Sequence, residues 1–128
     1  MVLNFKVISR TEPGVSGGGT RKWYATVTNR KFVGIDEITT QIEKSCTVNG
    51  ADVRAVLYAL VDVVQTNLAK GEIVDLQGFG SLRINISSKG QAGQNEVDAN
   101  TITGSRIIFN PSEKLKNMLK LLKFQKSE

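Results

Sequence analysis

The sequence predicts an α+β fold, with helices and strands in separate stretches of the chain. Apolar residues recur at helical spacing between positions 53 and 68, which indicates a long helix. Residues 73–77 and 82–87, on either side of Gly78-Phe79-Gly80, have the composition and alternation of strands. Between positions 87 and 100 the chain is polar, contains glycine and has little to bury. We therefore expect a body of helices and sheet from which residues 87–100 protrude.

The net charge of +5 is spread unevenly over the 128 residues. Residues 1–34 carry six Lys/Arg and one acidic residue, and residues 111–128 carry five and two. The stretch between them carries six basic and nine acidic residues. Two basic ends suit an anionic partner such as nucleic acid, although many basic proteins bind no anion. With no run of about 18 apolar residues and no signal-peptide pattern, a cytoplasmic protein is expected.

Two strands joined by a glycine-rich loop are expected at the N-terminus. Residues 2–8 alternate loosely, and residues 23–28 are aromatic and β-branched. The loop at 12–20 lacks the Lys-Ser/Thr pair that a phosphate-binding loop carries after its last glycine. A hairpin linker is therefore the preferred interpretation. A two-stranded hairpin is marginal by itself, so we expect it to pack on another part of the protein.

Two consecutive helices are expected next. Gly34 suits the N-cap of the first, with Asp36 and Glu37 in the first turn, where the helix dipole favours acidic side chains. Asn49 should cap the second helix, with Asp52 at its third position. The apolar residues of the second helix cover an arc of about 200°, wider than the ~100° stripe of a surface helix. Such a helix needs burial on two sides, so an intimate homodimer is expected.

Gly71 is expected to end this helix in the left-handed conformation. In the turn that follows, Gly78 and Gly80 are free to adopt positive φ, and Phe79 should anchor the core. If Phe79 is fully buried, its replacement by alanine costs about 3–5 kcal/mol. Residues 101–103 and 106–109 are strand-like and should return the chain to the body.

The last helix is expected to open at residues 110–113. Asn110 would be its N-cap, Pro111 its first residue and Glu113 its third. Lysines crowd its far end, which we expect to extend to Lys126, since basic side chains complement the dipole there.

This order of elements resembles the bacterial histone-like HU/IHF family. The resemblance covers residues 34 to about 123. Val74-x-Leu76-x-Gly78-Phe79-Gly80-Ser81-Leu82 is similar to the family's core signature, and Phe109 with Leu115-Lys116 is similar to the opening of its last helix. Residues 1–33 would then be an N-terminal β-hairpin extension, typical of a divergent branch. Residues 34–128 would be the HU/IHF-like DNA-binding domain, with an arm at about residues 84–106.

The resemblance implies an intertwined homodimer whose two β-arms lie in the DNA minor groove, where a proline at each arm tip bends the duplex. It implies sequence-tolerant binding of double-stranded DNA, as a nucleoid-associated architectural protein, by neutralising phosphates. No enzyme activity, metal, cofactor or small-molecule substrate is implied. The candidate DNA-binding residues are Arg83, Lys89 and Arg106 in the arm, and Lys114 and Lys116 beside it.

The arm departs from the family pattern. It has no proline between Ser81 and Asn110, and residues 83–106 hold three basic and two acidic residues. At position 113 the family pattern has a basic residue that contacts phosphate, whereas this chain has Glu113. Compensating charge is expected in the N-terminal region, at Lys6, Arg10, Arg21, Lys22, Arg30 and Lys31. An alternative function is a protein-interaction or scaffold module with little or no DNA binding.

Catalysis has little support. The chain has no histidine, so an ordinary triad is excluded and the single cysteine, Cys46, has no imidazole to activate it. Cys46 is interpreted as a buried bystander. Trp23 or Tyr24 could stack on bases, but neighbours in a strand face opposite ways, and packing within the protein is the preferred interpretation.

Overall fold

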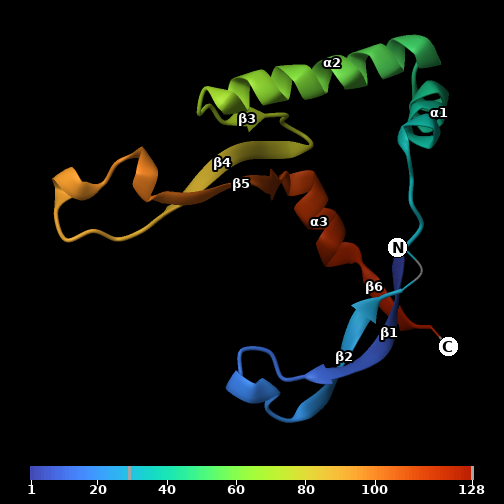
Figure 1. Ribbon diagram of the computed structural model, residues 1–128. Coiled ribbons are helices and arrows are strands. Elements are labelled where there is room, and N and C mark those ends of the chain that lie inside the picture. The colour runs from blue at the N-terminus through green and yellow to red at the C-terminus, as the bar shows by residue number, and fades with distance from the viewer. Residues whose placement is uncertain (29, 128) are drawn as a thin grey trace. The chain divides into compact units, whose positions relative to one another are not determined.

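The computed structural model describes residues 1–28 and 30–127 (Figure 1). Its helices and strands are β1 (Val2–Thr11), β2 (Arg21–Val27), α1 (Ile35–Ser45), α2 (Gly50–Ala69), β3 (Val74–Asp75), β4 (Gly80–Ser88), β5 (Ile102–Pro111), α3 (Glu113–Leu121) and β6 (Lys123–Lys126). The strands form two three-stranded sheets, in the orders β2-β1-β6 and β3-β4-β5. The predicted α+β class is therefore confirmed.

The chain divides into two compact units. The terminal unit comprises Met1–Val33 and Met118–Glu128, and the central unit comprises Gly34–Asn117. The boundary falls within α3.

The terminal unit contains the predicted N-terminal hairpin. β1 and β2 pair antiparallel, from Phe5 opposite Val27 to Thr11 opposite Arg21. The glycine-rich loop joins them through a 3₁₀ turn at Ser16–Gly18, with positive φ at four of its glycines. One face of the sheet is hollowed into an apolar groove of about 330 Å³, lined by Leu3, Phe5, Ala25, Thr26, Val27 and Phe124.

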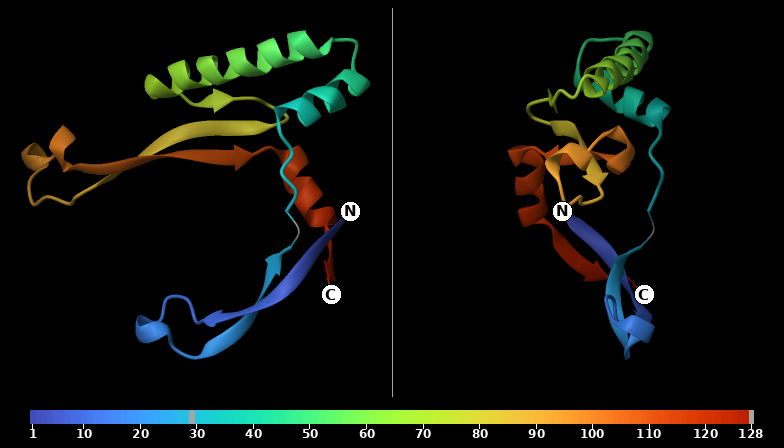
Figure 2. Two further views of the ribbon diagram at one scale, coloured as in Figure 1. Left: turned by 45° about the vertical axis from the view of Figure 1, so that its right-hand side comes forward. Right: turned by 60° about the vertical axis from the view of Figure 1, so that its left-hand side comes forward.

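The predicted length of the last helix is wrong. α3 ends at Leu121, and residues 123–126 form β6, parallel to β1 with Val2 opposite Lys123 (Figure 2). The Lys123 N–H donates to the Met1 carbonyl at 3.0 Å, and the Ser127 N–H donates to the Phe5 carbonyl at 2.8 Å. In β6 the backbone N–H and C=O groups pair with those of β1, whereas in a longer α3 they would have paired within the helix.

The two central helices begin where the sequence predicts. Gly34 is the N-cap of α1, with Asp36 and Glu37 in its first turn. At α2 the Asn49 side chain accepts a hydrogen bond from the Asp52 N–H at 3.0 Å. An ion pair of 2.9 Å between Arg54 and Asp36 links the helices, and its exposure limits its contribution to about 1 kcal/mol or less.

Gly71 ends α2 as predicted. Its φ is +81°, and its N–H donates to the Leu68 carbonyl at 2.9 Å. The next N–H, of Glu72, donates to the Asn67 carbonyl at 3.2 Å. This pair of bonds is the Schellman motif, which satisfies carbonyls that the helix end leaves without partners.

Most of the apolar surface of α2 is uncovered. Among the described residues, the buried apolar side chains are Val53 and Leu68. Tyr58 is 59% exposed, and both Val56 and Val61 are more exposed than that. A largely apolar groove of about 360 Å³ lies between α2 and the β4–β5 hairpin, lined by Val61, Val64, Gln65, Leu68, Ala69, Ile84 and Ile107. The chain alone does not provide the two-sided burial that this helix requires.

Cys46 is exposed, which contradicts the prediction that it is buried. It lies directly after α1, and its thiol donates to the Ile42 carbonyl at 3.2 Å. The end of α1 leaves this side chain at the rim of a small groove rather than in a core.

Candidate nucleic-acid interface

The β4–β5 hairpin starts from a tight turn after β3. The Leu76 N–H donates to the Gly80 carbonyl at 2.8 Å, which closes the turn. Gly80 has a φ of +145°, whereas Gly78 does not have a positive φ. The left-handed residue is instead Gln77, with a φ of 50°, and its N–H donates to the Asp75 carboxylate at 2.9 Å. An aspartate side chain bonded two residues ahead stabilises such turns.

Gly80 is the glycine that this site requires. It is buried, and a Cβ at this position would collide with the Asn110 carbonyl oxygen. The same Cβ would lie 2.8 Å from the Phe109 ring. Both its backbone conformation and its surroundings therefore exclude a side chain.

Phe79 is 56% exposed, so the expectation of a buried anchor is not met within this chain. Its ring lies against that of Phe109, with centroids 5.3 Å apart and planes at 52°. Such a tilted arrangement is favourable for aromatic pairs.

Ser112, rather than the predicted Asn110, is the N-cap of α3. β5 continues through Pro111, and the Ser112 hydroxyl oxygen accepts from the Leu115 N–H at 3.3 Å. The same hydroxyl donates to the Gly78 carbonyl at 2.7 Å. Ser112 therefore joins the start of α3 to the turn, which is a long-range contact that the local capping pattern did not reveal.

The paired strands β4 and β5 place most of their apolar residues on one face. Leu82 lies opposite Phe109 and Ile84 opposite Ile107, on one face. The alternate pairs occupy the other face, with Arg83 opposite Ile108 and Asn85 opposite Arg106. Arg83 and Arg106 therefore share a face, and Arg106 donates to the Ser87 hydroxyl at 3.5 Å.

The connection between β4 and β5 is held by its own polar groups. It contains 3₁₀ turns at Gln94–Glu96 and Ala99–Thr101. The Lys89 N–H donates to the Thr101 carbonyl at 2.9 Å, and the Thr101 hydroxyl donates to the Asp98 carbonyl at 2.7 Å. The Asp98 carboxylate accepts from the Asn100 N–H at 2.9 Å. This connection carries two acidic residues, Glu96 and Asp98, beside Lys89.

The five predicted DNA-binding residues do not form one cluster. Arg83 and Arg106 share a hairpin face, whereas Lys89 lies at the far end of β4. Lys114 and Lys116 are exposed on α3. Lys116 lines a polar groove of about 340 Å³ together with Asp75, Ser112 and other residues of the turn.

Charge is divided sharply between the two units. The central unit, which contains all five candidates, has eight Lys/Arg and ten Asp/Glu. The terminal unit has nine Lys/Arg and two Asp/Glu. The sequence pattern pointed to the basic N-terminal residues but assigned Lys123 to a helix, so its place beside them became visible only through β6.

Neither a candidate metal site nor a candidate membrane-spanning helix is found in the part of the chain that the structure describes. No group of three or more potential metal ligands comes together there. None of the described helices combines the length and apolar character needed to cross a membrane.

A family model identifies an HU domain in the chain, and a solved structure has a similar fold. A family model described as "HU domain fused to wHTH, Ig, or Glycine-rich motif" (HU-HIG) matches residues 1–126. No curated protein matches the chain. The fold is similar to a crystal structure from Bacteroides vulgatus ATCC 8482, of a protein provisionally named a bacterial DNA-binding protein. The TM-score is 0.67 at 16% identity, over 98% of this chain and 48% of the other, so this chain spans about half of that protein.

Proposed function

The chain belongs to the HU-HIG family, and from this premise we propose that it binds double-stranded DNA with little sequence preference, as an architectural protein of the bacterial nucleoid. The family match over residues 1–126 is the observation that carries the proposal. The provisional name of the Bacteroides vulgatus protein supports it, and so does the net positive charge of the chain. The protein would act by neutralising backbone phosphates, without catalysing a reaction.

In this proposal the β4–β5 hairpin acts as the arm, at about residues 84–106, of a DNA-binding domain at residues 34–128. Residues 1–33 extend that domain. Arg83 and Arg106 are supported as a pair because the strand register puts them on one face. Lys89, Lys114 and Lys116 would contact flanking phosphates. Because no proline lies between Ser81 and Asn110, we propose binding without the wedge that kinks a duplex.

The uncovered apolar surface of α2 supports a homodimer. Exposed valines and Tyr58 along this helix would be buried against a second copy, and apolar burial is the main favourable term in association. Sedimentation at micromolar concentration should give twice the chain mass of 14.0 kDa. Replacing Val61 by aspartate should shift the population toward the monomer, whereas Asp62→Asn, at the neighbouring position on the same helix, should not. A wild-type chain that sediments as a monomer would contradict the dimer.

DNA binding itself is tested by fluorescence anisotropy with a random-sequence duplex at two salt concentrations. If the chain neutralises about four phosphates, a fourfold rise in salt weakens binding about 100-fold, because the log–log slope is about −0.9 per phosphate. Absence of binding at low salt would overturn the proposal.

A protein-interaction module on the same fold is the second candidate. The excess of acidic residues in the central unit favours it, because a DNA-binding domain is ordinarily basic. Recovery of a defined protein partner after nuclease treatment, together with no retardation of duplex DNA, would select this alternative.

A further inference from the structure

The second face of the terminal sheet is basic. In β1, Lys6 and Arg10 lie on the face of Val2 and Ile8 and alternate with Leu3 and Phe5, which line the apolar groove, so they point away from it. Lys22 lies opposite Arg10 on β2, and Lys123 lies opposite Val2 on β6. Residues directly opposite one another project from the same side of a sheet. The strand register therefore collects a basic face, defined as Lys6, Arg10, Lys22 and Lys123.

The side chains of this face are positioned in different ways. The Arg10 guanidinium lies 4.6 Å from the centre of the Tyr24 ring, a cation–π contact that holds it over the sheet. Lys22 pairs with Glu12 at 2.8 Å. Lys6 and Lys123 form no ion pair among the residues that the structure describes. Two ammonium groups thus remain available to an external anion.

The dimensions of the face suit a polyanion. From Val2, opposite Lys123, to Arg10, opposite Lys22, β1 spans about 26 Å at a rise of about 3.3 Å per residue. That length corresponds to roughly eight base pairs of duplex at about 3.4 Å each. The face can therefore follow several successive phosphates rather than a single one.

We propose that this basic face binds the phosphate backbone of duplex DNA and is the chain's principal phosphate-binding surface, an inference that rests on the proposed function. The terminal unit holds nine basic and two acidic residues, whereas the unit with the hairpin holds eight and ten. Because phosphate neutralisation dominates non-specific affinity, the surface with the excess positive charge should contribute most of it.

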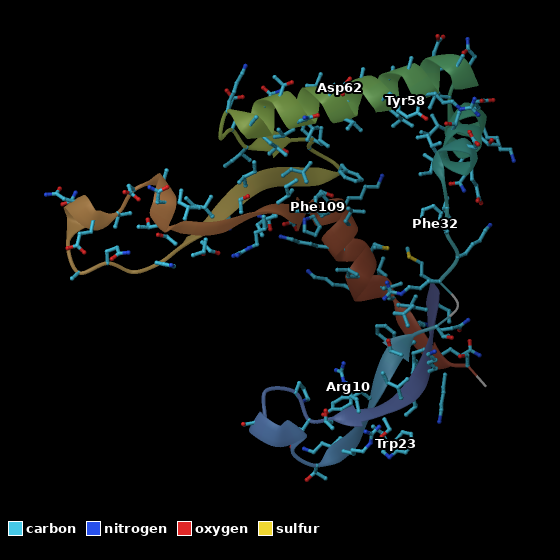
Figure 3. All side chains as sticks on the ribbon, in the orientation of Figure 1. Arg10, Trp23, Phe32, Tyr58, Asp62 and Phe109 are labelled. Carbon is cyan, nitrogen blue, oxygen red and sulfur yellow. The ribbon has the colours of Figure 1, made fainter. Side chains whose placement is uncertain are left out.

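The placement of the aromatic residues favours DNA over a membrane surface. The most exposed apolar anchors of the sheet, Trp23 at 73% and Phe124 at 66%, belong to the opposite face. Figure 3 shows Arg10 and Trp23 on opposite sides of the β1–β2 hairpin. Peripheral membrane binding combines basic and apolar side chains on one surface. In this sheet the opposite face, where Arg21 and Lys126 lie with Trp23 and Phe124, has that combination, and the basic face lacks these exposed aromatic anchors.

The experiment compares charge removal on the two faces of one sheet, in the full chain. Lys6→Gln with Lys123→Gln removes two charges from the basic face. Arg21→Gln with Lys126→Gln removes two from the opposite face, where Arg21 lies beside Thr11 and Lys126 beside Phe5. Arg83→Gln with Arg106→Gln tests the hairpin. Binding to a random-sequence duplex is measured by anisotropy across a salt series.

The basic-face pair should reduce the log–log salt slope by about 2, because each phosphate contact contributes about 0.9. The opposite-face pair and the hairpin pair should each change it by less than half as much. An unchanged slope for the basic-face pair, or an equal loss for the opposite-face pair, would overturn the inference. So would unchanged DNA binding accompanied by loss of binding to phosphatidylserine vesicles. If the wild-type chain binds no duplex at low salt, the proposed function itself fails.

A second measurement needs no substitution. Lysine acetylation of the wild-type chain, followed by mass spectrometry, should show Lys6 and Lys123 protected when duplex DNA is bound, with Lys126 as the internal control. Equal reactivity of Lys6 and Lys123 with and without DNA would overturn the inference even if the variants failed to fold.

Discussion

The central and terminal units carry different kinds of information about this protein. The central unit contains the segments by which the HU domain is recognised, around Gly78-Phe79-Gly80, yet it has more acidic than basic residues. The terminal unit, which the family model also covers, lacks this motif and holds the whole excess of basic over acidic residues. The motif and the excess positive charge therefore lie in different parts of one chain. Electrostatic partners are better located from the distribution of charge than from the motif.

The largest effect is expected at the turn of the central unit. Gly80→Ala should cost about 3–4 kcal/mol of unfolding free energy, since it adds backbone strain to a collision with the Asn110 carbonyl. Gly78→Ala is the control, because Gly78 has open space around its Cβ position and should change stability by less than about 0.5 kcal/mol. Urea unfolding at equal protein concentration measures both. Equal costs would mean that the turn does not depend on Gly80.

Phe79→Ala and Phe32→Ala compare an exposed aromatic residue of the central unit with one of the terminal unit. For a ring that is half-exposed and paired with Phe109, the cost should be about 1–2 kcal/mol. Phe32, which is 93% exposed in the terminal unit, should be replaceable by alanine without measurable loss (Figure 3). A cost of about 3–5 kcal/mol for Phe79→Ala would show that a second copy covers the ring.

Ser112→Ala tests whether the start of α3 is joined to the turn. It removes both the cap on the Leu115 N–H and the bond to the Gly78 carbonyl, and should cost about 1 kcal/mol or somewhat more. Ser105→Ala, at an exposed position on β5, is the matched control. Thermal unfolding of the two variants should differ by several degrees, and coincident curves would contradict the role assigned to Ser112.

The smallest effect is expected on the apolar face of the terminal sheet. Trp23→Ala should change the unfolding free energy by less than about 0.5 kcal/mol, because the indole is largely exposed. Quenching of Trp23 fluorescence by iodide should likewise be efficient. A cost above about 2 kcal/mol would mean that this face is covered in solution. The terminal unit would then resemble the central unit in having an apolar surface that is covered by a second copy or another partner.

Local sequence signals located three helix ends. The caps at Gly34, Asn49 and Gly71 were predictable because a capping residue acts on backbone groups within a few positions of itself. The N-terminal strands and the β4 alternation were predictable for the same reason, since apolar periodicity is a local property. Prediction failed at α3, where Ser112 bonds to a carbonyl 34 positions away.

The basic candidates were only partly predictable. The sequence identified the charge of Lys6, Arg10 and Lys22, and resemblance singled out Arg83 and Arg106. Alternation along one strand puts Lys6 and Arg10 on one face, but no local pattern shows that Lys22 joins them or that Arg83 and Arg106 share a face, because that depends on the partner strand and its register. Lys123 is the extreme case, since its neighbour on β1 is Val2, at the other end of the chain.

The motif around Gly80 was visible in the sequence alone, whereas the basic face depends on the tertiary structure. Sequence determined the family, the α+β class, the caps and the net charge, because each depends on residue identity and short-range spacing. The tertiary structure decided that residues 123–126 form β6, and that Lys123 shares one surface with three basic residues more than 100 positions earlier in the chain. Strand pairing joins distant segments through backbone hydrogen bonds that carry no side-chain signature, so their arrangement could not be read beforehand.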